Sequence, residues 1–155
     1  MYDARQIANW FVRRAAADGK KLSIMQLLKL VYISHGWHLE ITGNPLFRNK
    51  IEAWQHGPVV PDVYREFRPK GVIVDHIDGS MPEVLPARLT GFLDEIYRLY
   101  GSYSPFRLSE ITHVAGGPWD QATKRHGWYA PITDDVILDH YRKLRSERRE
   151  GSSVN

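Results

Sequence analysis

The chain of 155 residues is long enough to bury a sizeable core in one domain, and it has no cysteine, which excludes a disulfide framework and thiolate metal sites or nucleophiles. Its 21 Lys and Arg against 18 Asp and Glu leave a formal net charge of +3, too weak an excess to argue for nucleic-acid binding. No stretch approaches the roughly 18 apolar residues of a membrane helix, and the opening residues lack the order of a signal peptide. We therefore expect a cytoplasmic protein with no membrane association.

Two helices are predicted in the first third of the chain. The first spans residues 3–17, where Asp3 can cap the helix and apolar residues recur on one face. The second begins at the N-cap Ser23 and ends at Gly43, which tolerates a left-handed conformation. Its apolar side chains form two neighbouring stripes, which are Ile24, Leu27, Leu28 and Val31 beside Leu30, Ile33, Trp37 and Ile41. A helix that is apolar over more than one stripe is covered on several sides, so we expect it at the centre of the fold.

The rest of the chain alternates short helices with turns. Further helices are predicted over residues 61–67, 87–100, 105–116, 118–124 and 133–147, with short β-like runs at 48–55, 72–74 and 128–132. In the helix over 87–100, the apolar period places an inward face of Leu89, Phe92, Leu93, Ile96 and Leu99. We therefore predict a mainly α fold with minor β, a compact single domain around a central buried helix. The domain is expected to span residues 1–147, and the polar residues 148–155 are expected to form a disordered tail.

No pattern in the sequence predicts catalysis or metal binding. His35 and His38 have the spacing of zinc ligands but lack a third ligand, and we interpret them as hydrogen-bonded to backbone at the end of a buried helix. No nucleophile motif or phosphate-binding loop is present. Asp134 and Asp135 fit the start of a helix better than an acid–base pair. We expect no catalytic residue, no metal and no cofactor, and hence not an enzyme.

Two other classes of function stay open. A small His-dependent enzyme would need His56, His113 and nearby carboxylates to converge in one pocket. A nucleic-acid-binding regulator would need the basic run at residues 142–149 to share one face with a second basic group. That second group comprises Arg13, Arg14, Lys20 and Lys21. Acidic residues interrupt the basic run, which is typical of a solvated helix end, so we do not expect a nucleic-acid partner.

Several segments resemble a known family. The segments LLKLVYISHGWHL, NPLF and IEAWQHGPVVPDVY resemble the central motif of the Panacea antitoxin domain, the SocA-like family. The downstream segment ITHVAGGPW resembles the second motif of that family, and ARQIANWFVRRA and YGSYSPFRLSE fit its order. Together these segments cover residues 4–128.

The resemblance implies a bacterial antitoxin that binds a cognate toxin protein directly and neutralises it. Part of the family acts as an adaptor that delivers the toxin to a protease, which would be a second partner. Glycine and proline hold a surface rigid at low entropic cost, and aromatic and Arg side chains anchor interfaces, so we expect the toxin near the GPVVP turn and the following motif. The candidate partner-binding residues are Trp54, Gln55, His56, Gly57, Pro58, Val59, Asp62, Tyr64, Arg65, His113 and Trp119. Of these, Trp54 and Trp119 are expected mainly in the core.

Overall fold

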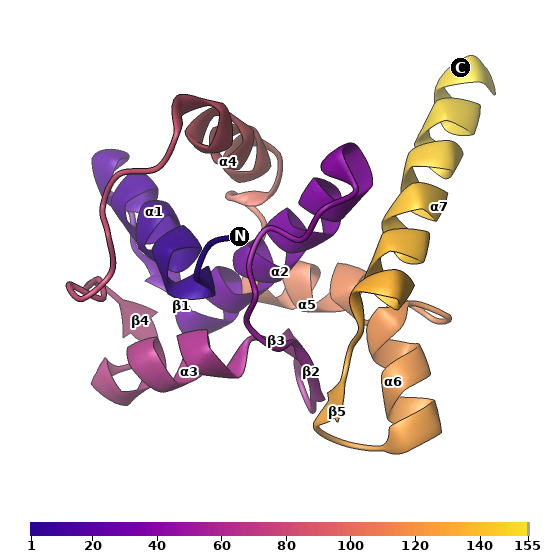
Figure 1. Cartoon of the computed structure of the whole chain (residues 1–155), viewed down its shortest axis with the longest axis horizontal. Helices are drawn as coiled ribbons and strands as arrows, with labels where there is room; N and C mark the ends of the chain where they lie inside the picture. Colours follow the sequence, from indigo (N-terminus) through magenta and orange to yellow (C-terminus); the bar gives the residue numbers. More distant parts are fainter. Residues whose placement is uncertain (155) are drawn as a thin grey trace.

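The structure, a computed structural model, describes residues 1–154, with side chains as far as residue 149. Helices dominate the described chain (Figure 1). They are α1 (Ala4–Ala17), α2 (Ile24–Thr42), α3 (Pro61–Phe67), α4 (Ala87–Tyr100), α5 (Pro105–Thr112), α6 (Pro118–His126) and α7 (Asp134–Val154), with a 3-10 helix at Arg68–Lys70. The strands are β1 (Leu22–Ser23), β2 (Glu52–Trp54), β3 (Gly57–Val59), β4 (Ile73–Val74) and β5 (Ala130–Pro131). The predicted mainly α fold with minor β is confirmed.

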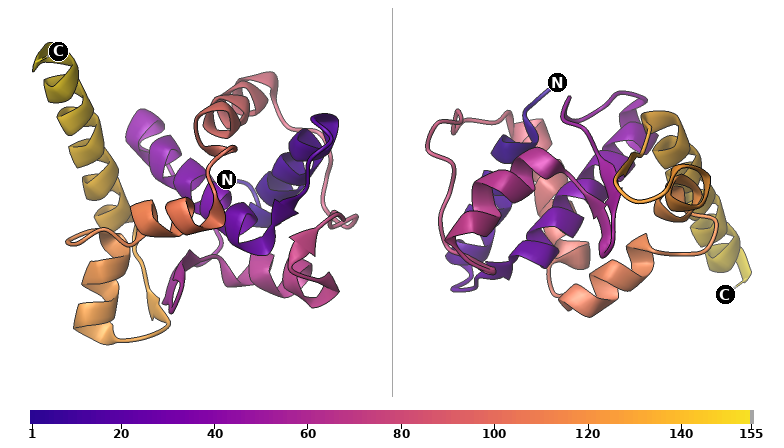
Figure 2. Two further views of the ribbon diagram at one scale, coloured as in Figure 1. Left: turned by 180° about the vertical axis from the view of Figure 1, so that it is seen from behind. Right: turned by 90° about the horizontal axis from the view of Figure 1, so that it is seen from below.

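Helix α2 lies at the centre of the molecule, as predicted, and α1, α3, α4, α5 and α7 all pack against it (Figure 1, Figure 2). Ser23 caps the helix by accepting a hydrogen bond from the amide of Gln26, and Gly43 ends it with a φ of 76°. Leu30 is fully buried. Ile41, which was expected in the core, is 57% exposed, because the last turn of α2 borders an open groove between α4 and α7.

Helix α7 reaches the core by packing against a glycine of α2. At Gly36 an added methyl group would overlap the ring of Tyr141, so the missing side chain lets the two helices approach closely. Tyr141 also meets the ring of Trp37 edge-on, with the ring centroids 4.9 Å apart. The side chains of residues 146–149 are exposed, and the C-terminal end of α7 projects from the body of the molecule (Figure 1).

Two small antiparallel sheets join distant segments. Strand β2 lies between β3 and β5, and its Ala53 pairs with Pro58 on one side and Ala130 on the other. Strand β1 pairs with β4, so the short strand predicted at 72–74 is present. The sequence assigned Gly57–Val59 to a turn before the helix at 61–67. It is a strand because its backbone pairs with β2.

Two other boundaries and one burial prediction differ from expectation. Helix α5 ends at Thr112 rather than near residue 116, because His113 already leaves the helical conformation. Helix α6 is longer than predicted and ends at His126. Leu99, expected to face inward on α4, is 40% exposed and lines the same groove as Ile41.

The C-terminal end of the described chain is helical, since α7 continues to Val154. The division into a domain of residues 1–147 and a disordered tail at 148–155 stays a prediction, and Asn155 lies outside the described residues. Among the described helices, none combines the length and apolarity that a bilayer crossing requires.

The approach of α7 to α2 predicts opposite effects of two Gly-to-Ala substitutions. Gly36→Ala should lower the free energy of unfolding by about 1–3 kcal/mol, because the methyl group displaces the Tyr141 ring from a packed core. Gly91→Ala, in an exposed turn of α4 with open space around its Cα, should raise that free energy by about 0.5–1 kcal/mol through helix propensity. Urea unfolding of both variants measures the difference. Equal stabilisation by both substitutions would contradict the close α2–α7 contact.

Candidate functional site

The structure places the predicted partner-binding residues on the β2–β3 hairpin, the start of α3 and the segment that joins α5 to α6. We call this set the motif surface. It comprises Trp54, Gln55, His56, Gly57, Pro58, Val59, Asp62, Tyr64, Arg65, His113 and Trp119. Gln55, His56, Asp62 and Arg65 are exposed, Gly57, Pro58 and Val59 are buried, and the others are half-buried. The prediction that these residues bind a partner stays a prediction.

Aromatic rings join the hairpin to its neighbours. The Trp54 ring meets the Tyr64 ring of α3 edge-on, with centroids 4.9 Å apart. Its indole N–H donates to a carboxylate oxygen of Glu52 at 2.9 Å. From α6, the indole N–H of Trp119 donates to the carbonyl of Trp54 at 2.7 Å. Trp54 and Trp119 are thus half-buried and pack against the core, and the N–H of Trp119 ties the hairpin to α6.

The ring of His113 belongs to the same aromatic cluster, whereas the ring of His56 does not. The imidazole of His113 packs against Trp119 at a tilt of 59°, with ring centroids 4.2 Å apart. The Ser109 hydroxyl lies 3.2 Å from both the carbonyl oxygen of His56 and Nδ1 of His113. The His56 side chain is exposed. The two histidines therefore meet through one serine and a backbone carbonyl, which favours the structural interpretation over a catalytic pocket.

A buried lysine supports strand β3 of the hairpin from below. Lys29 of α2 is fully buried, and its ammonium donates to the carbonyl of Pro58 at 3.1 Å. Burial disfavours the charged amine and lowers the pKa of Lys29 to about 7. A Cβ at Gly57, which has a φ of 121°, would lie 2.6 Å from Nζ of Lys29 and 2.9 Å from the ring of His113. Only glycine leaves room for both side chains under the turn.

Two exposed aromatic residues extend the cluster and were left out of the predicted set. Tyr129 is 62% exposed, and its ring centroid lies 5.6 Å from that of Trp54. Trp128 is 58% exposed, and its ring centroid lies 6.1 Å from that of Trp119. Tyr129 has a φ of 64°, which costs a bulky residue about 1–3 kcal/mol and is found more often at functional sites. The two aromatic residues directly after Gly127 were the sequence signal that could have identified this site. No sequence signal indicated the left-handed backbone conformation of Tyr129.

The histidines of α2 have structural partners. His35 pairs through Nε2 with the Asp134 carboxylate of α7 at 2.8 Å, so its predicted backbone hydrogen bond is wrong. The buried imidazole instead meets the first turn of α7 because Gly36 brings that helix close. Nδ1 of His38 meets the carbonyl of Asn44 at 2.8 Å, as expected. Among the described residues, no group of three His, Asp or Glu side chains is placed to hold a metal ion.

The two basic groups lie far apart, and several of their members are paired. Helices α1 and α7 stand on opposite sides of α2 (Figure 1, Figure 2). On α1, Arg13 pairs with Glu83 at 3.0 Å and Arg14 with Asp94 at 2.7 Å. On α7, Arg145 pairs with Glu40 of α2. This arrangement does not form the single basic face that a phosphate backbone requires.

Comparison with known proteins places the chain in a family of antitoxins. The family described as "Antitoxin SocA-like, Panacea domain" matches residues 27–120, and the chain belongs to it. The chain is also similar to Antitoxin SocA of Caulobacter vibrioides, with 36% identity over 155 aligned positions that cover 90% of this chain and 82% of the relative. No solved structure matches the chain. The family resemblance of the motifs is thus confirmed.

Burial of Lys29 predicts that stability depends on pH. The amine has a pKa of about 7 in the folded protein and 10.5 as its ordinary value, so between these pH values the unfolded chain holds a proton that the folded chain lacks. The free energy of unfolding should therefore rise with pH across this window and fall as pH is lowered through it. Lys29→Met removes this contribution, so the stability of the native protein relative to the variant should increase from pH 7 to about pH 9.5.

Urea unfolding at both pH values tests this prediction. Lys20→Met, which alters an exposed lysine, is the control and should give a stability difference that does not change with pH. A pH-independent difference for Lys29→Met as well would mean that the amine is not held in an apolar site.

Proposed function

We propose that this protein neutralises a cognate toxin by binding it directly through the motif surface. Membership of the SocA-like antitoxin family is the observation that carries the proposal. The proposal places this action in the cytoplasm and requires no catalysis, cofactor or metal, since occupation of the toxin surface is enough to block it.

The physical state of the motif surface supports this role. Its hairpin is held from three sides, by Lys29 below, Tyr64 of α3 beside it and Trp119 of α6 across it. A surface fixed in this way loses little conformational entropy when a partner binds. Exposed Tyr129 and Trp128 add large aromatic area at its edge, which is typical of residues that anchor an interface.

An adaptor role is the second part of the proposal, in which the bound toxin is delivered to a protease. Delivery requires that the toxin be degraded faster when the antitoxin is present than when it is absent. The toxin half-life, followed after synthesis is stopped in cells with and without the antitoxin, tests this part separately. An unchanged toxin half-life would exclude the adaptor role and would mean that the antitoxin acts only by occupying the toxin surface.

Substitutions of exposed residues test the motif surface without disturbing the core. Arg65→Glu and Gln55→Arg, alone and together, should weaken toxin binding by roughly tenfold or more and restore toxicity in cells that express both proteins. The reason is that they reverse or introduce charge at the centre of the proposed contact while leaving the buried Gly57–Val59 strand intact. Calorimetry with the purified product of the adjacent reading frame, tested as the toxin, and growth of the co-expressing strain give the two readouts.

Lys20→Glu is the matched control, because it reverses an exposed charge on the turn between α1 and β1. Its affinity and rescue should equal those of the native protein. Melting curves confirm that each variant is folded. Native affinity in the Arg65→Glu and Gln55→Arg double variant would exclude the motif surface as the contact, and a toxin that never co-purifies would exclude direct neutralisation.

A further inference from the structure

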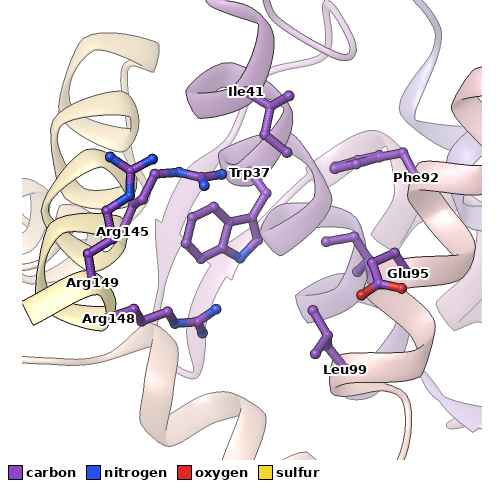
Figure 3. Close-up of a pocket in the computed structure, with 9 residues that line it drawn as sticks. Trp37, Ile41, Phe92, Glu95, Leu99, Arg145, Arg148 and Arg149 are labelled. Atoms are coloured by element: carbon purple, nitrogen blue, oxygen red, sulfur yellow. The ribbon is translucent and has the colours of Figure 1, made fainter. Parts of the chain in front are cut away.

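A second concave site lies away from the motif surface, between α2, α4 and the C-terminal half of α7 (Figure 3). This groove has a volume of about 600 Å³. Trp37 forms its floor, and Ile41 and Leu99, which are 57% and 40% exposed, stand at its edges. Large apolar side chains gathered in an open groove are unusual in a surface that only faces water, and they indicate a docking site.

One wall of the groove is basic. Arg145, Arg148 and Arg149 extend from α7 on one side of Trp37, and Phe92, Glu95 and Leu99 lie on the other side (Figure 3). The Arg148 guanidinium lies 5.0 Å from the Trp37 ring centroid and donates to the Tyr100 hydroxyl at 3.1 Å. On the opposite wall, the Glu95 carboxylate is paired within α4 to Arg98. The groove therefore offers an apolar floor beside positive charge that its own acidic residue does not neutralise.

We propose that this groove binds an acidic amphipathic segment of the toxin, with apolar side chains on Trp37, Ile41 and Leu99 and carboxylates on Arg148 and Arg149. The inference rests on the proposed function and adds a second contact to it. Charge complementarity selects this occupant, since carboxylates form bidentate hydrogen bonds with guanidinium groups beside an apolar surface. A second copy of the chain fits less well, because Glu95, the acidic residue that lines its groove, is already paired with Arg98 and offers no free carboxylate to the arginine wall.

The groove lies at the end of α2 remote from the motif surface. Ile41 is about 18 Å along the helix from Lys29, which supports strand β3. Its apolar floor belongs to the segment matched by the family, residues 27–120, whereas the arginine wall of α7 lies outside that segment. The charge that selects the occupant thus comes from a part of the chain that the family match does not define.

The test uses the intact protein and the purified product of the adjacent reading frame, tested as the toxin. Arg148→Glu with Arg149→Glu, and separately Ile41→Ser, should each weaken binding by roughly tenfold or more in calorimetry. Arg142→Glu on an exposed position of α7 and Val84→Ser in the loop before α4 are matched controls, which should bind as the native protein does. Toxin binding should also slow hydrogen exchange in α4 and the second half of α7.

A charge swap shows whether the contact is acidic. Lysine substituted for the carboxylates of the toxin segment that becomes protected should restore binding to the arginine-reversed variant. If the loss of Arg148 lowers the melting temperature, the single variants Arg149→Glu and Ile41→Ser replace the double variant in the test. Both Ile41 and Arg149 are exposed, so their substitution leaves the core intact.

Each alternative has its own signature. Native affinity in both groove variants, while the motif-surface variants lose binding, would overturn the groove inference and leave the proposed function standing. A native dimer that the groove variants convert to monomers with unchanged toxin affinity would assign the groove to a second copy and overturn it as well. A toxin that does not bind the unaltered protein would end both proposals.

Discussion

Helix α2 is buried along most of its length, so the polar groups that it carries must find partners within the protein. Each partner fixes a different part of the molecule. Lys29 holds the carbonyl of Pro58 and so strand β3 of the β2–β3 hairpin. His35 holds Asp134 and so the start of α7. The central helix therefore does more than fill the core, because its buried polar side chains position both the motif surface and the helix that forms one wall of the groove.

The sequence predicts local features well where a short-range contact determines them. Asp3, Ser23 and Ser104 cap helices through their own neighbours along the chain, so α1, α2 and α5 begin where expected. Strand β3 was missed, because Gly57 and Pro58 are typical of turns and only pairing with β2 makes that segment a strand. The left-handed conformation of Tyr129 was missed for a similar reason, since the pairing of its amide with Ala53 fixes it from another part of the chain.

The burial of Ile41 and Leu99 was predicted wrongly, and the two errors have one cause. Both residues follow the apolar period of their helices, so the pattern places them in a core. Both instead line the groove, whose existence depends on how α2, α4 and α7 diverge. The apolar period shows which face of a helix is apolar. It does not show whether that face is covered by another part of the same chain or by a partner protein. Ile41 and Leu99, the exposed members of their apolar stripes, therefore lie in the groove that we propose as a partner-binding site.

Helix α7 is anchored in the core at its N-terminal end and projects from the molecule at its C-terminal end. Ile137 and Tyr141 anchor its first turns in the core, whereas residues 146–149 have exposed side chains. Beyond the anchored turns, Leu144 packs against the core. The Arg145–Glu40 ion pair, the Arg148 guanidinium over the Trp37 ring and the hydrogen bond from Arg148 to Tyr100 also hold α7 toward α2 and α4. Contacts of this kind contribute on the order of 1 kcal/mol each. The basic wall of the groove therefore depends on a few polar contacts of this size, whereas its floor at Trp37 belongs to the packed centre of the molecule.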